Sequence, residues 1–170
     1  VVRCLGAFEV QIGPARVENW RSGKARALFE YLVTHGNRPI ARETLIEALW
    51  PDPDALAAGT SLKVSVHALR QVLQAVTNAG QCSVPVILAH ASGYQLQAPD
   101  LWLDVDEFER LYALGRRLEA QGCKAESLTQ YARAVELYRG DFLSDSWSDW
   151  VVYRREGLKD QYLAMLARLA

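Results

Sequence analysis

Short apolar stretches separated by glycine and proline open the chain. Between Leu5 and Ile12 apolar and polar side chains alternate loosely, and Gly6 and Gly13-Pro14 bound the stretch. Alternation of this kind with turn residues at its ends is typical of short strands joined as a hairpin. The segment Val17–Trp20 predicts a further short strand. Residues 1–20 therefore predict small β-elements and no helix.

From residue 22 onward the apolar residues recur at helical spacing. Ser22 is a suitable N-cap and Gly36 a suitable stop for a helix whose apolar positions are Ala25, Leu28, Phe29, Leu32 and Val33. A second helix follows the extended segment 38–40 and ends at Pro51, with an apolar face formed by Leu45, Ile46, Leu49 and Trp50. Ala41 is a poor cap for this helix, although Glu43 favours its first turn.

A third helix, predicted from an N-cap at Asp54 to Val76, has two unlike faces. Its buried stripe falls at i, i+4, i+7 and i+11 and consists of Leu62, Val66, Leu69 and Leu73. The opposite face carries small residues and hydrogen-bond donors and no acid: Thr60, Lys63, Val64, His67, Arg70, Gln71 and Gln74. A helix in the DNA major groove needs donors toward base edges and phosphates and no carboxylate to repel the backbone. The alternative is an ordinary solvated face.

Directly after this helix the pattern returns to strands. A break at Asn78-Ala79-Gly80 precedes the apolar run Val84–Leu88, and a turn at His90–Gly93 leads into Tyr94–Gln97. Two such runs around a glycine-containing turn predict a β-hairpin. Strands, three helices and a terminal hairpin form a helix-turn-helix with a wing. In this arrangement the third helix enters the major groove and the wing tip approaches the minor groove.

The remainder of the chain shows helical spacing only. Helices are predicted over 105–121, over 124–138 and from Ser148 to the end, with Gly122 and Gly140 as stops. Alanines at tight positions (Ala125, Ala132 and Ala134) make these helices similar to tetratricopeptide units, which stack into protein-binding grooves. Only about one and a half helix pairs are present, so we expect a truncated array with an exposed apolar end.

Composition is that of an ordinary globular protein. The 170 residues include 19 Lys+Arg and 20 Asp+Glu, and half are hydrophobic. No apolar run approaches the ~20 residues of a membrane-spanning helix, so no membrane association is predicted. Three widely spaced cysteines (Cys4, Cys82 and Cys123) argue against a disulfide framework and fit a reducing cytoplasm. Because Met and a signal-peptide layout are absent at the start, we expect a segment cut from a longer chain.

The charges are unevenly distributed along the chain. Residues 55–99 contain no Asp or Glu and only two cations, Lys63 and Arg70, whereas residues 100–170 hold thirteen acidic and ten basic residues. An acid-free stretch in a mildly acidic chain suits contact with a polyanion. Two cations are few for a DNA footprint, since affinity usually depends on several phosphate contacts. Charge therefore leaves open both a DNA-facing surface and a hairpin without such a role.

The residues of catalytic and metal-binding motifs do not come together. Gly23-Lys24 lacks the earlier glycine and the following Ser or Thr that a phosphate-binding loop needs. Acidic residues near position 105 are interpreted as charges that complement a helix dipole: Asp100, Asp104, Asp106 and Glu107. Trp50, Trp102, Trp147 and Trp150 are interpreted as core or interdomain packing and not as a base-stacking platform. We predict no catalytic residue, no metal ligand and no cofactor-binding residue, and we do not expect an enzyme.

Segments in the right order resemble one bacterial family. LGAFEV, GKARALFEYLV, RPIARETLIEALWPD, SLKVSVHALRQVL and SGYQL together resemble the OmpR/PhoB-type DNA-binding domain, in the version found in the SARP family (Streptomyces antibiotic regulatory proteins). DVDEF, RAVELYRGDFL and WVVYRRE resemble the bacterial transcriptional activator domain of that family. The resemblance implies a mixed α/β winged helix-turn-helix over 1–98, followed by an all-α, tetratricopeptide-like domain over 99–170.

The resemblance also implies a function. Such proteins are transcriptional activators that bind promoter direct repeats, two subunits head to tail on double-stranded DNA, and help RNA polymerase holoenzyme settle on a weak promoter. No cofactor is implied.

The predicted DNA contacts lie on the third helix and the wing. We expect contacts to bases or nearby phosphates from Lys63, Arg70 and Gln71, and contacts to the backbone from Thr60, His67 and Gln74. The wing tip, from His90 to Ser92, is expected to approach the minor groove. Related winged helices often carry Arg at the position of His90 and a donor at that of Ala68, so we expect modest intrinsic affinity. The alternative function is a protein- or ligand-binding scaffold whose winged helix has lost DNA binding.

Overall fold

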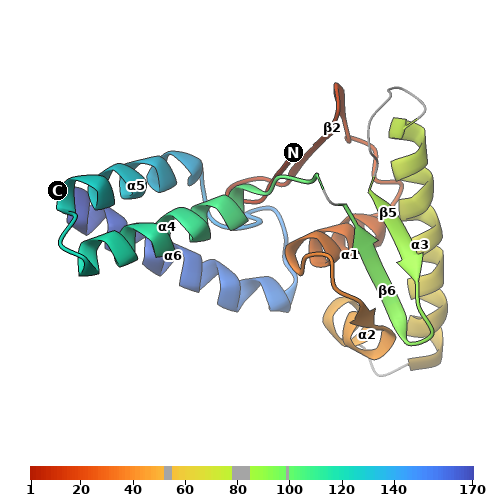
Figure 1. Cartoon of the computed structure of the whole chain (residues 1–170). Coiled ribbons are helices and arrows are strands. Elements are labelled where there is room, and N and C mark those ends of the chain that lie inside the picture. Colours follow the sequence, from red (N-terminus) through yellow and green to blue (C-terminus); the bar gives the residue numbers. More distant parts are fainter. Residues whose placement is uncertain (52–54, 78–84, 99) are drawn as a thin grey trace. The chain divides into compact units, whose positions relative to one another are not determined.

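The computed structural model describes residues 1–51, 55–77, 85–98 and 100–170 (Figure 1). The chain divides into two units: one is Val10–Leu101, and the other combines Val1–Glu9 with Trp102–Ala170. The first nine residues therefore group with the C-terminal helices, although about ninety residues of sequence separate the two segments. The predicted boundary between residues 98 and 99 follows the order of the sequence, so it assigns residues 1–9 to the first domain.

Three helices build the core of the unit Val10–Leu101: α1 (Gly23–Thr34), α2 (Arg42–Leu49) and α3 (Ala55–Thr77). The predicted cap of α1 is confirmed, because the Ser22 side chain accepts a hydrogen bond from the Ala25 N–H at 3.0 Å. As expected from Ala41, α2 begins without a side-chain cap. The predicted buried stripe of α3 is confirmed, since its members are at most 3% exposed: Leu62, Val66, Leu69 and Leu73. The expected N-cap Asp54 lies outside the described residues.

The predicted wing is confirmed as a hairpin of β5 (Val86–Ala89) and β6 (Gly93–Gln97). A short strand between α1 and α2, β4 (Ile40–Ala41), pairs antiparallel with β6 and completes a sheet of order β4-β6-β5. Gly93 makes this pairing possible. A Cβ atom at Gly93 would lie 1.8 Å from the Ile40 carbonyl oxygen, so only glycine allows the two backbones to approach. Val84 and the Asn78-Ala79-Gly80 break lie outside the described residues.

A second hairpin joins β2 (Glu9–Ile12) to β3 (Ala15–Arg16) through the turn at Gly13-Pro14. The prediction of strands from Leu5 to Ile12 is therefore correct only from residue 9 onward. The predicted strand Val17–Trp20 is wrong. Only its first residue continues the pairing, through a hydrogen bond from the Val17 N–H to the Val10 carbonyl at 2.9 Å, and the chain then turns into the cap of α1.

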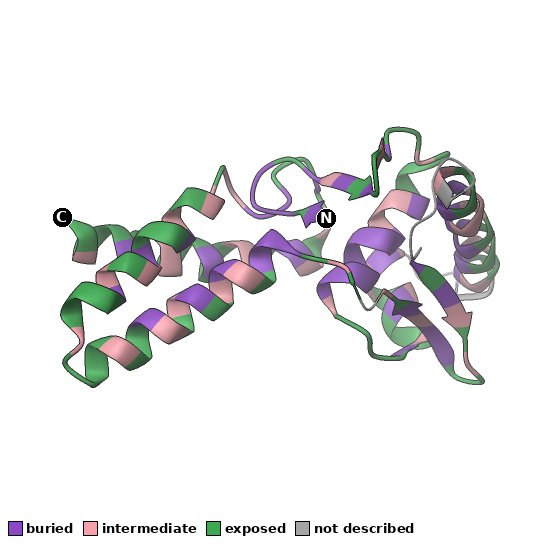
Figure 2. Ribbon diagram, turned by 45° about the horizontal axis from the view of Figure 1, so that its top comes forward, coloured by how far each residue is buried: buried purple, intermediate pink, exposed green. Residues whose placement is uncertain are grey.

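The second unit contains the three predicted C-terminal helices: α4 (Asp104–Ala120), α5 (Lys124–Leu137) and α6 (Asp149–Leu169). Gly122 forms the turn between α4 and α5 with a φ of 79°, in the left-handed region that favours glycine. Figure 2 shows buried and exposed residues alternating along α4, the pattern of a helix packed on one face. The wholly buried Tyr131 of α5 packs its ring directly over Gly115 of α4.

The N-terminal segment, including β1 (Val2–Arg3), is held on this helical unit by backbone hydrogen bonds. The buried carboxylate of Asp104 accepts from the N–H groups of Cys4 and Leu5 at 2.7 and 3.0 Å. In return, the Cys4 carbonyl accepts from the Leu143 N–H at 2.7 Å. Burial raises the pKa of Asp104 above its ordinary value, although these hydrogen bonds oppose the shift. Asp104 is thus more than a charge at a helix terminus, which was all that the sequence pattern indicated.

Exposed residues of α6 and of the segment just before it bear out one prediction and correct another. Leu163, Leu166 and Leu169 are 52%, 37% and 37% exposed, which confirms the expected apolar end of the helical array. Trp147 is 93% exposed, so its assignment to packing is wrong. This tryptophan lies just before Ser148, the N-cap of α6, and points to solvent although Ser146 and Val151 on either side of it are buried.

Candidate nucleic-acid interface

The outward face of α3 carries the side chains that its periodicity predicted there. Thr60, Lys63, His67 and Gln74 are exposed, and Arg70 and Gln71 are partly buried. Val64, in the middle of the same face, is 63% exposed. No residue of α3 is acidic. The face therefore offers donors and one apolar side chain to solvent, with no carboxylate among them.

Arg70 has a structural contact that sequence reasoning did not anticipate. Its Nη2 donates a hydrogen bond to the Ile87 carbonyl of β5 at 2.8 Å. A guanidinium carries five N–H donors, and this bond uses one of them. Arg70 therefore fixes the wing hairpin against α3, in addition to the DNA contact predicted for it.

Two other predicted side chains on this face are paired with each other. The Nε2 atoms of Gln71 and His67 lie 3.0 Å apart, one helical turn from one another. The Gln71 Nε2 is an amide nitrogen and donates, so the His67 Nε2 is the acceptor. The pair restricts the rotamers of both side chains, so less conformational entropy would be lost when they meet a ligand.

The wing tip is held close to the start of α2. His90 lies with its Nε2 2.8 Å from the Gln95 Oε1 of β6, so its ring is engaged within the hairpin. Ser92 is exposed, and its carbonyl accepts a hydrogen bond from the Arg42 N–H at 2.9 Å. The wing and α2 thus form one continuous surface beside α3.

A pocket of about 270 Å³ opens on this surface, between α2, α3 and β6. Its lining includes Arg42, Thr60, Lys63 and Tyr94. The Arg42 guanidinium lies over the Tyr94 ring, 5.9 Å from its centroid, and its Nε is buried without a hydrogen-bond partner among the described residues. Such an unpaired buried donor is destabilising by ~1–3 kcal/mol unless a ligand satisfies it.

Sequence reasoning missed Arg42 as a candidate site residue. The structure brings it together with two predicted residues, Thr60 and Lys63, in that one pocket. The wing residues His90 and Ser92 do not line the pocket. The available signal was positional: Arg42 is a cation at the first position of the second helix, where backbone N–H groups and side chains commonly meet phosphate.

Two family models match the chain in succession. Residues 18–96 match the model described as "Transcriptional regulatory protein, C terminal". Residues 103–170 match the model described as "Bacterial transcriptional activator domain". The first match contains α1, α2, α3 and all of the wing except Gln97, and the second contains the whole of α4, α5 and α6.

The chain is similar to mycobacterial transcriptional regulators. It is 31% identical to the transcriptional regulatory protein EmbR of Mycobacterium tuberculosis over 141 residues, which are 83% of this chain and 35% of EmbR. It is 27% identical to the transcriptional regulatory protein MoaR1 of the same species over 123 residues, which are 72% of this chain and 39% of MoaR1. The chain therefore spans well under half the length of these relatives.

A solved structure shares the fold. The structure of Mycobacterium tuberculosis EmbR in complex with a low-affinity phosphopeptide matches with a TM-score of 0.79 at 25% sequence identity. The match covers 96% of this chain and 42% of that one.

Two further observations concern the described residues alone. None of their helices is long and apolar enough to cross a bilayer. The same residues contain no group of three or more His, Cys, Asp or Glu that could hold a metal ion. With both family models matched in order and with EmbR-like relatives, the chain belongs to the SARP-type transcriptional regulators, which combine an OmpR/PhoB-type domain with a bacterial transcriptional activator domain.

Proposed function

We propose that this chain is a cytoplasmic, sequence-specific DNA-binding activator of transcription. The observation that carries the proposal is the exposed, acid-free face of α3 beside the wing. A helix of this width fits the major groove, and donors on its outer side can reach base edges and phosphates. The exposed Val64 suits contact with a thymine methyl group.

We assign the proposed DNA contacts to the residues of α3 and the wing according to the length and position of each side chain. Lys63, Arg70 and Gln71 contact bases or nearby phosphates. Thr60, His67 and Gln74 contact the backbone, and the wing tip from His90 to Ser92 approaches the minor groove. Because His90 is engaged with Gln95, the wing adds little base readout, and specificity rests on α3.

The pocket beside α3 supports the same function. A DNA phosphate placed there would accept from the buried Nε of Arg42 and would meet the Lys63 ammonium and the Thr60 hydroxyl. Phosphate contacts of this kind set the register of a helix-turn-helix on the duplex without carrying sequence information. Arg42 is therefore proposed as a positioning contact.

The family supports a larger assembly. We propose that two copies bind head to tail on promoter direct repeats, and that the helical domain contacts RNA polymerase or the neighbouring subunit. Each copy presents one α3, so two adjacent repeats offer twice the phosphate contacts of a single site.

A gel-shift titration on the promoter fragments nearest the gene tests DNA binding. Binding through phosphates should weaken by about 0.9 decade per tenfold rise in salt for each phosphate neutralised. Lys63→Gln should reduce that slope by about 1, whereas Lys159→Gln, which removes an exposed lysine from α6, should leave it unchanged. No shift on any fragment at low salt would contradict the proposal.

The scaffold alternative has one specific observation in its favour. Lys63 and Arg70 are the only cations of α3, and Arg70 is already bonded to the Ile87 carbonyl. In that function the helical domain would bind a partner protein or ligand and the winged helix would not bind DNA. The gel shift separates the two, because only the activator function requires a salt-dependent complex.

A further inference from the structure

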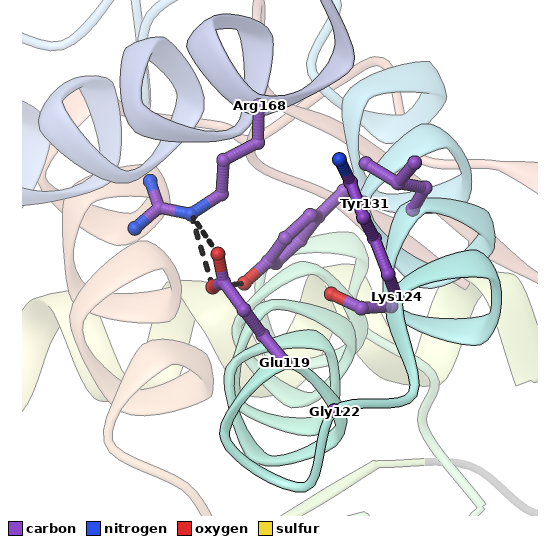
Figure 3. Close-up of a pocket in the computed structure, with 7 residues that line it drawn as sticks. Glu119, Gly122, Lys124, Tyr131 and Arg168 are labelled. Carbon is purple, nitrogen blue, oxygen red and sulfur yellow. Dashed lines mark hydrogen bonds and ion pairs between the residues drawn. The ribbon is translucent and has the colours of Figure 1, made fainter.

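A second pocket, of about 350 Å³, lies in the helical unit where the α4–α5 turn meets the last turn of α6. It is lined by Glu119, Gly122, Lys124, Ser127, Leu128, Tyr131 and Arg168. Figure 3 shows the Tyr131 ring between the Arg168–Glu119 pair and Lys124. The pocket belongs to the unit without α3, so it plays no part in the proposed DNA contacts.

One wall of this pocket is a fixed cation. The Arg168 Nε donates to both carboxylate oxygens of Glu119 at 3.1 and 3.0 Å, and the Tyr131 hydroxyl donates to the same carboxylate at 2.9 Å. A further bond from Arg168 Nη1 to the Ala164 carbonyl leaves Nη2 outside these contacts. The hydrogen bond from Tyr131, together with that from Arg168, lowers the pKa of Glu119, so Glu119 stays charged and keeps the guanidinium oriented.

The other wall carries a cation in an unfavourable position. Lys124 is exposed and is the first residue of α5. A positive charge at a helix N-terminus is disfavoured by the helix dipole. No ion pair or side-chain hydrogen bond joins Lys124 to any residue in the described part of the chain. The sequence therefore keeps a lysine where the local fold gains nothing from it.

The balance of groups selects the ligand. Two cations face the pocket against one carboxylate, so the net charge of its lining is positive and it favours an anion. Leu128 supplies an apolar side chain beside the charges. We propose that this pocket binds a carboxylate of an acidic peptide segment from a partner protein, with the carboxylate at Lys124 and Arg168 and an adjoining apolar side chain on Leu128.

The ion pair between Glu119 and Arg168 leaves room for a second carboxylate on Arg168. Its side chains are 43% and 33% exposed, and solvent-exposed ion pairs contribute little to stability. An incoming carboxylate can therefore share the Arg168 guanidinium through Nη2 without breaking a strong internal contact.

Fluorescence anisotropy with the whole 170-residue chain tests this proposal. The probe is a short, fluorescein-labelled peptide of alternating leucine and glutamate, compared with one in which glutamine replaces each glutamate. The acidic peptide should bind at least about fivefold more tightly than the glutamine peptide. Lys124→Gln should remove that difference, whereas Lys159→Gln, the matched loss of an exposed α6 lysine, should preserve it.

Three results would overturn the proposal. Equal binding of the two peptides would show that no carboxylate is recognised, and equal weakening by both lysine variants would show only general charge attraction. Tighter binding of a phosphoserine version than of the glutamate version would show that the pocket prefers a phosphate group to the proposed carboxylate. Circular dichroism of each variant confirms that the helices are intact, and DNA binding should be unaffected by Lys124→Gln.

Discussion

Two glycines in helices of the same unit should respond in opposite ways to alanine. Alanine is favoured over glycine inside a helix by about 1 kcal/mol. Nothing lies within 4 Å of a Cβ placed at Gly157 in α6, so Gly157→Ala should raise the free energy of unfolding by about that amount. This variant is the control, because it isolates the backbone effect.

Gly115→Ala should lower the free energy of unfolding instead. Its Cβ would lie 2.4 Å from Cε1 and 2.7 Å from Cδ1 of Tyr131, so the ring would have to shift by roughly 1 Å to restore ordinary contact. Tyr131 is wholly buried, and its hydroxyl is bonded to Glu119, so the ring has little room to move. Overpacking of this kind is destabilising by about 1–3 kcal/mol, which exceeds the gain in helix propensity.

Urea denaturation followed by circular dichroism at 222 nm measures both effects on the helical unit. The two variants should differ in unfolding free energy by about 2 kcal/mol, with the wild-type chain between them. If Gly115→Ala is stabilised as much as Gly157→Ala, the α4–α5 packing described above is wrong.

Three further changes test contacts in both units. Gly93→Ala should destabilise the wing by about 3 kcal/mol, because its Cβ would meet the Ile40 backbone; a melting curve like that of the wild type would contradict the β4–β6 pairing. Arg70→Ala should lower stability by about 1 kcal/mol and DNA affinity by about 1–3 kcal/mol, and an effect on only one of the two quantities would disprove its double role. Burial raises the pKa of Asp104, so the Asp104 carboxyl group keeps its proton to higher pH in the folded chain than in the unfolded chain. The stability that Asp104 contributes therefore falls as pH rises through the folded pKa. The unfolding free energy of the wild type relative to Asp104→Asn should therefore increase from neutral pH toward 3.8, and the opposite trend would refute the burial argument.

Most helices of this chain could be predicted because their signals are local. Ser22 caps α1 through a residue three positions away, and the buried stripe of α3 follows from spacing alone. The N-terminal segment could not be placed in this way. Its partner Asp104 is separated from Cys4 by 100 residues, and no local pattern tells a short strand which distant element it will join. The error at Val17–Trp20 has a different, local origin, since β3 ends at Arg16 and the chain then leads into the N-cap of α1.

The candidate interface was predictable as a face but not as a set of contacts. Helical periodicity placed Lys63 and its neighbours on one side of α3, and the structure agrees. The bond between Arg70 and Ile87 and the packing of Arg42 on Tyr94 depend on tertiary pairing between elements. The exposure of Trp147 also escaped prediction, because a large aromatic residue is usually buried and its type carries no information on its partners.

Photocrosslinking from the centre of the α3 face tests the central claim most directly. Val64, 63% exposed, is replaced by p-benzoylphenylalanine, and Val152 of α6, 50% exposed, is replaced in a control chain. With a promoter fragment that the chain shifts in a gel, the account predicts a strong covalent DNA adduct from position 64 and little or none from position 152. Equal crosslinking from the two positions, or none from position 64 in a chain that still shifts DNA, would contradict the docking of α3 on the duplex.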